Sequence, residues 1–185
     1  VFVPKRHTVP LPGFFGLDGE DKWDYPISLD LVSKYYDVVN SAEEADFALV
    51  MIEEPNAGQG YSVDDQKAGG NGYIPISLQY GEYTATAARD ASIAGGDPKE
   101  PFTNRSYKGK TVKAYNYDDL LLVKDTKSVM GSKPVIVVVN CGRPFVPSEI
   151  EPLADAMLLT FHVTQQAVLD IISGKHEPSA LLPMD

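Results

Sequence analysis

Two adjacent carboxylates, Glu53 and Glu54, are the side chains of this sequence best suited to general acid–base chemistry. They follow the apolar run 47–52, and Pro55 directly after them takes the chain out of regular structure. An apolar surround favours the neutral, proton-donating form of a carboxyl group. Glycoside hydrolysis uses two carboxyl groups, one of which is kept protonated in this way. The alternative is a solvated loop start in which one glutamate faces water.

A second polar stretch, residues 141–144, follows the most strongly apolar segment of the chain, residues 134–139. Gly142 permits a tight turn there, and Arg143 can hold a carboxylate or a sugar hydroxyl. Alternatively, Arg143 pins the domain to a neighbour. Cys141 is the only cysteine, so an internal disulfide is excluded, and its place after an apolar strand predicts a buried structural thiol.

The three histidines are scattered, and none has a metal-like spacing to another. His162 follows the apolar segment 156–161 and is a candidate for lining a ligand cleft, although a structural histidine is the alternative. The glycine-rich pieces 58–60 and 69–72 lack the strand-to-helix context and the lysine of nucleotide-binding loops. We therefore expect neither a metal nor a cofactor.

Composition limits the class of protein. The chain has 185 residues, of which 43% are apolar and 23% charged, which predicts one globular domain. Its net charge of −10, without a basic patch, argues against nucleic acid as a partner. No apolar run approaches the roughly 18 residues of a membrane span. Because the chain opens on Val1, we expect a segment of a longer polypeptide, and its localisation stays open.

The elements that must position these side chains alternate between strand and helix. Strands are predicted at 47–52, 134–139 and 156–161, with minor ones at 1–3 and 36–39. Helices are predicted at 29–36, 41–44, 118–130, 147–153 and 164–173, with Ser28 and Asn116 as caps and Gly131 and Gly174 as stops. Continuous apolar strands between helices indicate a three-layer α/β/α sandwich with a mostly parallel, flavodoxin-like sheet.

Ligands of such sheets bind beyond the carboxyl ends of the strands. The ends that matter here are residues 53–54, 140–143 and 161–162. We therefore expect the carboxylates, Arg143 and His162 to share one edge of the sheet.

Two segments show no regular pattern. Residues 4–26 are predicted to form an ordered surface loop. Residues 53–113 are rich in Gly, Tyr, Asn and Asp and are much longer than an ordinary connection, with only the Ala-rich stretch 83–94 predicted helical. Aromatic faces pack on sugar rings and amides hold hydroxyl groups, so this segment is a candidate cleft loop, with an inert insertion as the alternative. The candidate substrate-binding side chains are Gln59, Tyr61, Asn71, Tyr73, Gln79 and Tyr80, together with Arg143 and His162.

Six motifs occur in a fixed order over nearly the whole chain after Ala45: the apolar strand 47–52, Gly-Gln-Gly-Tyr-Ser at 58–62, the Lys-Pro-Val strand at 133–139, Cys-Gly-Arg-Pro at 141–144, Ala-Asp-Ala-Met-Leu at 154–158, and residues 178–183. This series resembles the C-terminal α/β-sandwich domain of glycoside hydrolase family 3. The insert contains Gly-Gly-Asn-Gly-Tyr-Ile-Pro-Ile-Ser-Leu-Gln-Tyr at 69–80 and Ala-Gly-Gly-Asp-Pro at 94–98. In these stretches it resembles a bacterial, β-glucosidase-like branch of the family.

The resemblance implies retaining hydrolysis of a terminal β-linked sugar. In that family an aspartate nucleophile lies on a (β/α)8 barrel domain that normally precedes the sandwich domain, and the acid/base glutamate commonly comes from the sandwich domain. The implied partners are a carbohydrate and the barrel domain of the same enzyme, and oligomers stay open. No barrel sequence is present, so we expect the isolated chain to be inactive.

Two departures from the family pattern matter. Gln59 occupies the slot between two glycines where many members have the acid/base glutamate, and an amide cannot donate a proton as an acid. The acid must then be Glu53, Glu54 or Glu82, come from elsewhere, or be absent. Family members have Pro-Gly-Gln-x-Gly after the last strand, whereas this chain has His-Val-Thr-Gln-Gln at 162–166 and so lacks the glycines. The alternatives are a catalytically silent carbohydrate-binding or structural module and a stand-alone flavodoxin-like regulator.

Overall fold

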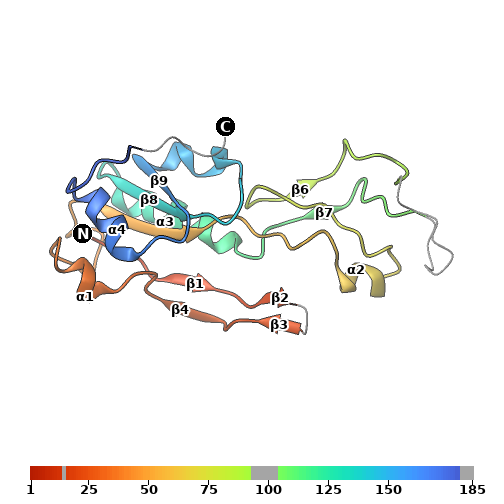
Figure 1. The fold of residues 1–185 in the computed structure, drawn as a ribbon, viewed down its shortest axis with the longest axis horizontal. Helices are drawn as coiled ribbons and strands as arrows, with labels where there is room; N and C mark the ends of the chain where they lie inside the picture. The colour runs from red at the N-terminus through yellow and green to blue at the C-terminus, as the bar shows by residue number, and fades with distance from the viewer. Residues whose placement is uncertain (14–15, 93–103, 180–185) are drawn as a thin grey trace. The chain divides into compact units, whose positions relative to one another are not determined.

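The computed structural model describes residues 1–13, 16–92 and 104–179 (Figure 1). The chain divides into two compact units. The first, which we call the sheet unit, comprises Val1–Pro10, Gly19–Glu54 and Asp118–Asp185. The second, the insert unit, comprises Leu11–Asp18 and Pro55–Tyr117. The segment predicted as an irregular connection therefore makes up most of a compact unit.

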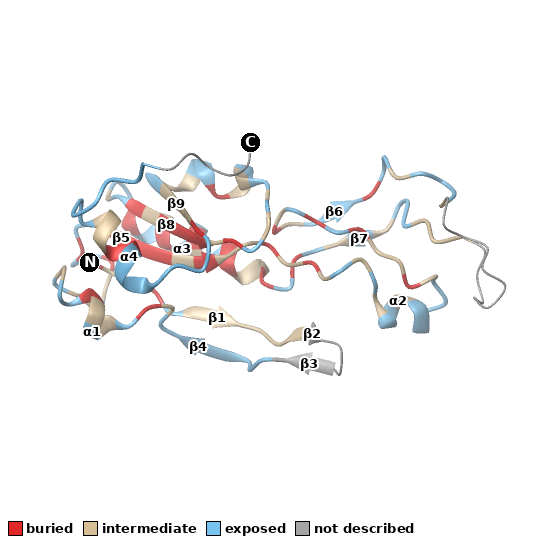
Figure 2. Cartoon of the chain, in the orientation of Figure 1, coloured by how far each residue is buried: buried red, intermediate tan, exposed pale blue. Residues whose placement is uncertain are grey.

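Three parallel strands form the centre of the sheet unit: β5 (Ala48–Glu53), β8 (Val135–Asn140) and β9 (Ala156–Thr160), in the order β5-β8-β9. Most side chains of β5 and β8 are buried (Figure 2), as expected for strands covered on both faces. The predicted mixed α/β fold with a parallel sheet flanked by helices is confirmed.

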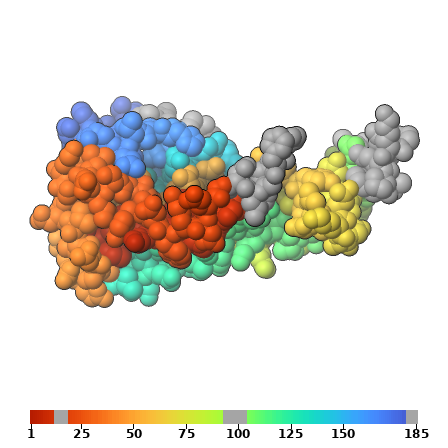
Figure 3. Space-filling view, turned by 90° about the horizontal axis from the view of Figure 1, so that it is seen from below, coloured from red at the N-terminus to blue at the C-terminus, as the bar shows by residue number. Residues whose placement is uncertain are grey.

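Helices cover this sheet: α1 (Leu29–Val32), α3 (Tyr117–Met130) and α4 (Gln165–Ile172). On one face, Leu49 of β5 and Val138 of β8 pack in one core cluster with Val168 and Leu169 of α4 and with Val32 of α1. Alternate strand residues point to the other face, and α3 lies behind the sheet in the view in which α4 lies in front (Figure 1). Residues of α1 and the N-terminal strands form much of the surface of the sheet unit in Figure 3.

Several predicted helix ends are confirmed, but α1 ends at Val32 instead of continuing to residue 36, and the side-chain oxygen of Asn116, predicted as a cap, accepts from the backbone N–H of Asn56. The Ser28 hydroxyl accepts a hydrogen bond from the backbone N–H of Leu31 at 3.4 Å, and Thr164 caps α4 in the same way. Gly131 and Gly174 follow α3 and α4 with φ of +60° and +73°, the left-handed conformation that ends helices.

Residues 4–26 do not form the predicted loop, because most of them pair into two short antiparallel ladders. In the sheet unit β1 (Arg6–Thr8) pairs with β4 (Lys22–Asp24). In the insert unit β2 (Leu11–Gly13) pairs with β3 (Gly16–Asp18). Strands of three residues are too short to show an alternating pattern, and the prolines and glycines between them obscured the pairing.

The other corrections concern short elements. The predicted helix 83–94 is wrong over residues 83–92, because Tyr83–Thr84 forms strand β6, paired with β7 (Thr111–Val112), and turns follow. Residues 93–94 lie outside the described part of the chain. Pairing with a distant strand overrode the helix propensity of the alanines. Residues 147–153 form two 3₁₀ turns, η1 (Pro147–Glu149) and η2 (Glu151–Leu153), since each contains a proline without an N–H donor.

The remaining short predicted elements also need correction, and two of the sequence motifs extend beyond the described residues. Of the minor strands at 1–3 and 36–39, only isolated bridges of Phe2 to Val39 and Ala48 form. Residues 41–44 form a turn rather than a helix. The Ala-Gly-Gly-Asp-Pro motif at 94–98 and the end of the motif at 178–183 lie outside the described residues.

The insert unit is held by polar contacts of its own. Its helix α2 (Val63–Lys67) is capped by Ser62, whose hydroxyl accepts from the N–H of Asp65 at 3.2 Å. The Lys110 ammonium contacts the Asp65 carboxylate at 2.6 Å and the side-chain oxygen of Asn71 at 2.7 Å. These contacts explain how a segment without hydrophobic periodicity adopts a defined conformation.

Across the described residues of both units, no helix has the length and apolar character that a membrane span requires.

His7 of β1 links the ladder of β1 and β4 to the start of α3 through side-chain contacts. Its Nδ1 lies 2.6 Å from the Asp118 carboxylate and its Nε2 lies 2.9 Å from that of Asp21. The ring also stacks on Trp23, with the centroids 4.6 Å apart. Hydrogen bonds to Asp21 and Asp118 raise the pKa of His7, because both carboxylates favour the imidazolium.

The stabilising effect of His7 is expected to depend on pH. The folded-state pKa is raised, so its contribution is complete below about pH 6.5 and is lost as the pH rises through the folded pKa. Thermal unfolding of His7→Gln at pH 5.5 should show a stability deficit of about 1 kcal/mol or less, which shrinks by pH 9. The exposed His176→Gln variant is the control. A deficit that grows with pH would contradict this assignment.

Candidate functional site

The carboxyl ends of the three parallel strands bring polar residues to one edge of the sheet. In the register of the ladders, Glu53 at the end of β5 lies opposite Asn140 of β8, and Asn140 lies opposite Thr160 of β9. Glu54 follows β5 directly, and His162 comes two residues after the end of β9. The structure therefore brings together the predicted candidates Glu53, Glu54, Arg143 and His162.

Asn140 connects the groups of this edge. Its amide nitrogen Nδ2 donates to Oε2 of Glu53 at 2.9 Å and lies 3.2 Å from Nδ1 of His162. Its oxygen Oδ1 accepts from the backbone N–H of His162 at 3.1 Å and from the Thr160 hydroxyl at 3.4 Å. His162 itself has a φ of +55°, so the chain turns sharply at the point where the ring meets Asn140.

The surroundings of Glu53 alter the ionisation of its carboxyl group. Burial raises the pKa of Glu53, while the hydrogen bond from Asn140 and the charge of Arg6 act in the opposite direction. The net result is a carboxyl group that keeps its proton to higher pH than an exposed glutamate does. This is the property expected of a general acid.

Glu54 is engaged differently. Its Oε2 accepts from the backbone N–H of Gly142 at 3.0 Å, and its Oε1 lies 3.8 Å from Nε of Arg143. A Cβ atom at position 142 would lie 3.4 Å from Oε1 of Glu54 and 3.6 Å from Nε2 of His162. Gly142 thus leaves a gap between the carboxylate and the imidazole that a methyl group would fill.

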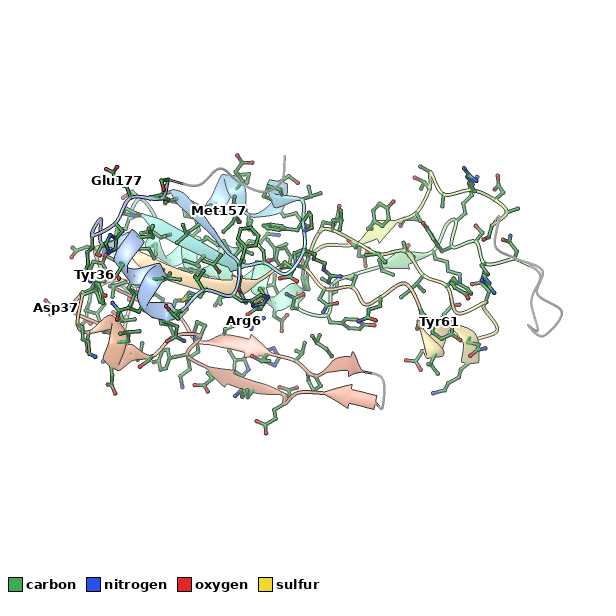
Figure 4. The ribbon with its side chains drawn as sticks, in the orientation of Figure 1. Arg6, Tyr36, Asp37, Tyr61, Met157 and Glu177 are labelled. Carbon is green, nitrogen blue, oxygen red and sulfur yellow. The ribbon has the colours of Figure 1, made fainter. Side chains whose placement is uncertain are left out.

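Arg6, labelled in Figure 4, supports this edge from β1. Its guanidinium binds the Asp119 carboxylate through two contacts, Nε to Oδ1 at 2.6 Å and Nη2 to Oδ2 at 2.9 Å. The Asp119 side chain is only 1% exposed, and it also accepts from the backbone N–H of Glu53 at 3.3 Å. The ion pair therefore fixes the backbone of Glu53.

A cavity of about 370 Å³ opens at this edge of the sheet unit. Polar lining comes from Glu53, Asn140, Thr160, His162, Arg6 and Gln165, and the remaining lining residues are apolar. A cavity of this size accommodates a small ligand such as a single sugar ring. The mixture of carboxyl, amide and imidazole groups suits a ligand that carries several hydroxyls.

Cys141 takes no part in this chemistry. It is 1% exposed, and burial together with the charges of Glu54 and Glu53 raises its pKa to about 11. The thiol is therefore protonated and unreactive at neutral pH, in line with the structural role predicted for it.

In the insert unit, a second cavity of about 390 Å³ is lined by three tyrosine rings, Tyr73, Tyr83 and Tyr107, and by Arg105. Some of the predicted binding residues lie at this cavity and others do not. Tyr73 lines the cavity, and the exposed ring of Tyr61 (Figure 4) meets the Tyr73 ring edge-on at 5.7 Å. Gln59 is exposed and does not line the cavity, so Tyr73 is the described candidate of this unit that lines a hollow surface.

Other predicted residues of the insert unit have structural contacts. Tyr80 is fully buried and packs in the interior. The Asn71 amide donates to the carbonyls of Asn104 and Ser106 at 2.7 and 2.8 Å, and so binds two loops together. The Gln79 amide donates to the Glu82 carbonyl at 3.0 Å, and the Glu82 side chain is exposed.

Asn140 lies in the strand end 140–143 that the sequence indicates but had no assigned role there, and Thr160 and Arg6 were missed as site residues. Asn140 and Thr160 end their strands, so the predicted sheet register could have pointed to them. Arg6 had no such signal, because it lies in the segment predicted as a loop and is far from Asp119 in the sequence.

Within the described parts of the chain, no group of three or more His, Cys, Asp or Glu side chains is arranged to hold a metal ion. Comparisons of the whole chain with protein-family models, with curated proteins and with solved structures find no significant match.

Proposed function

We propose that this chain is a domain of a retaining β-glycoside hydrolase in which Glu53 is the proton donor. The observation that carries the proposal is the environment of Glu53. Its carboxyl group lies at the carboxyl edge of a parallel sheet, beside a cavity of about 370 Å³, with a pKa raised by burial. The ordered motif series of glycoside hydrolase family 3 is consistent with this assignment.

The proposed chemistry needs little from the rest of this unit. A protonated Glu53 donates its proton to the glycosidic oxygen as the bond to the departing sugar breaks. The resulting carboxylate then activates the water that releases the second product. The nucleophilic carboxylate would come from a (β/α)8 barrel domain that is not part of this chain, as the resemblance implies.

Glu54 and Glu82 are weaker candidates. Glu54 accepts from the Gly142 amide and faces Arg143, contacts that suit a role in holding the turn at 141–144. Glu82 is exposed, so no apolar surround favours its neutral, proton-donating form. Of these three candidates, Glu53 is therefore the carboxyl group whose surroundings favour proton donation.

A catalytically silent carbohydrate-binding module is the second candidate. The cavity of the insert unit supports it, since tyrosine rings line a hollow surface in a segment that also contains Gln59 in place of an acid. In that case Glu53 contributes to structure alone.

Single Glu→Gln variants of the full-length protein distinguish the two functions. Glu53→Gln should lower kcat for an aryl β-glycoside with a poor leaving group by about 10²-fold or more, because no proton can be donated. Activity should fall as the pH rises through the raised pKa of Glu53, and this limb of the pH profile should vanish in the variant. Glu82→Gln is the matched control. If no Glu→Gln variant lowers the rate, the silent module is the better assignment.

The same substrates test where the site lies. The isolated chain should be inactive, and activity should require its neighbouring sequence, because the nucleophile is supplied from outside. Hydrolysis by this chain alone would exclude a site shared with a barrel domain.

A further inference from the structure

We propose that Asn140 is a positioning residue that orients the Glu53 carboxyl group and also selects the Nε2–H tautomer of His162. The two side chains would then meet one ligand, Glu53 through its carboxyl group and His162 as a hydrogen-bond donor to a ligand oxygen. The catalytic part of this inference rests on the proposed function, whereas the tautomer follows from the geometry of the sheet unit.

The orientation of the Asn140 amide is fixed by a backbone group. Oδ1 lies 3.1 Å from the N–H of His162, which can only donate, so the oxygen must be on this side. The Thr160 hydroxyl at 3.4 Å reinforces the assignment. The NH₂ group therefore faces Glu53 and the imidazole.

This orientation decides which imidazole nitrogen carries the proton. Nδ2 has two hydrogens, one directed to Oε2 of Glu53 at 2.9 Å and the other to Nδ1 of His162 at 3.2 Å. Nδ1 must then accept, because a proton on it would oppose the amide hydrogen. A neutral His162 consequently carries its proton on Nε2.

The Nε2 atom is left available for a ligand. In the described part of the chain no protein group hydrogen-bonds to it, and the ring lines the cavity together with Glu53 and Asn140. Gly142 keeps the space beside it open, since a Cβ there would lie 3.6 Å from Nε2. A hydroxyl or ether oxygen of a sugar is the acceptor that suits this donor.

The charges around Glu53 come from three elements. Arg6 of β1 lowers the pKa of Glu53, and Glu54 and Asp119 raise it, while the Asn140 hydrogen bond also lowers it. Removing the Asn140 amide should therefore raise the pKa of Glu53 further. A purely structural asparagine, acting only through stability, would not change both this pKa and the tautomer of His162.

Nitrogen-15 NMR of the imidazole rings at pH 8, where histidine side chains are ordinarily neutral, tests the inference on the whole chain. Wild type should show a preference of about tenfold for Nε2–H at His162, whose signals are identified by their loss in His162→Gln. In Asn140→Asp the new carboxylate accepts only, so the proton should move to Nδ1. Asn140→Ala should weaken the preference. Asn40→Asp, the same change at an exposed position, should leave it intact.

A carbon-13 titration of the Glu53 carboxyl group gives the second readout, with a higher pKa expected in Asn140→Ala than in wild type. A wild-type His162 protonated on Nδ1 would overturn the inference, even if no variant folds. An unchanged tautomer in a folded Asn140→Asp would do the same. The proposed function fails separately, if Glu53→Gln leaves hydrolysis by the full-length protein intact while the tautomer is as expected.

Discussion

Replacing Arg6 by methionine should lower the free energy of unfolding by about 3–5 kcal/mol, which corresponds to roughly 10 °C in Tm. The Asp119 side chain is 1% exposed and receives two contacts from the guanidinium. Methionine fills much of the volume of arginine but leaves a buried carboxylate without its cation. Because Asp119 also holds the backbone N–H of Glu53, the variant should disturb the candidate site as well.

Thermal and denaturant unfolding of the chain at pH 7 provide the measurement. Lys22→Met is the matched control, because the Lys22 ammonium is 3.8 Å from Asp24 and both side chains are at least half exposed, so its loss should cost less than about 1 kcal/mol. The double variant Arg6→Met/Asp119→Leu should recover part of the loss. Equal losses of unfolding free energy in Arg6→Met and Lys22→Met would show that the ion pair of Arg6 with Asp119 is no stronger than a surface contact.

Leu169→Ala in α4 should cost about 2–5 kcal/mol of unfolding free energy. Leu169 is 0% exposed and packs in one cluster with Leu49 and Val138 of the sheet. Alanine leaves a cavity between the helix and the sheet that the backbone of the strands cannot close. The neighbouring wall of the cavity at the carboxyl edge, which includes Val168, should loosen at the same time.

Leu121→Ala in α3 is the matched control for this change. Leu121 is 37% exposed, so the same truncation should cost markedly less there. Unfolding curves of both variants measured under one set of conditions give the difference directly. Similar losses at the two positions would mean that the face of the sheet covered by α4 is not the main core of the unit.

The regular part of the fold was open to prediction from sequence because its signals are local. The apolar runs behind β5 and β8 and the stop at Gly131 depend on neighbouring residues alone. The ladders of β1 with β4 and of β6 with β7 were missed, because their stability comes from a partner elsewhere in the chain. Strands of two or three residues carry no periodicity that reveals such a partner.

The residues of the candidate site also differ in how far the sequence alone could predict them. Glu53 and His162 could be proposed because each follows a recognisable strand, and parallel strands end at a common edge. The connecting role of Asn140 depends on distances across three strands, which no single segment contains. Tyr80 shows the opposite case: an aromatic in a polar segment suggested a sugar platform, yet the ring is buried.

The two ends of the segment 55–117 are joined by hydrogen bonds, and this has a consequence for folding kinetics. The N–H of Tyr115 donates to the carbonyl of Asn56 at 2.7 Å, and the N–H of Asn56 donates to the Asn116 side chain at 2.8 Å. Neighbouring strands β5 and β8 are separated in sequence by residues 55–117 of this unit and by α3, so their pairing must close a long loop. If the insert unit forms first, the loop is effectively shortened, and the entropic barrier to sheet nucleation falls by about 1 kcal/mol.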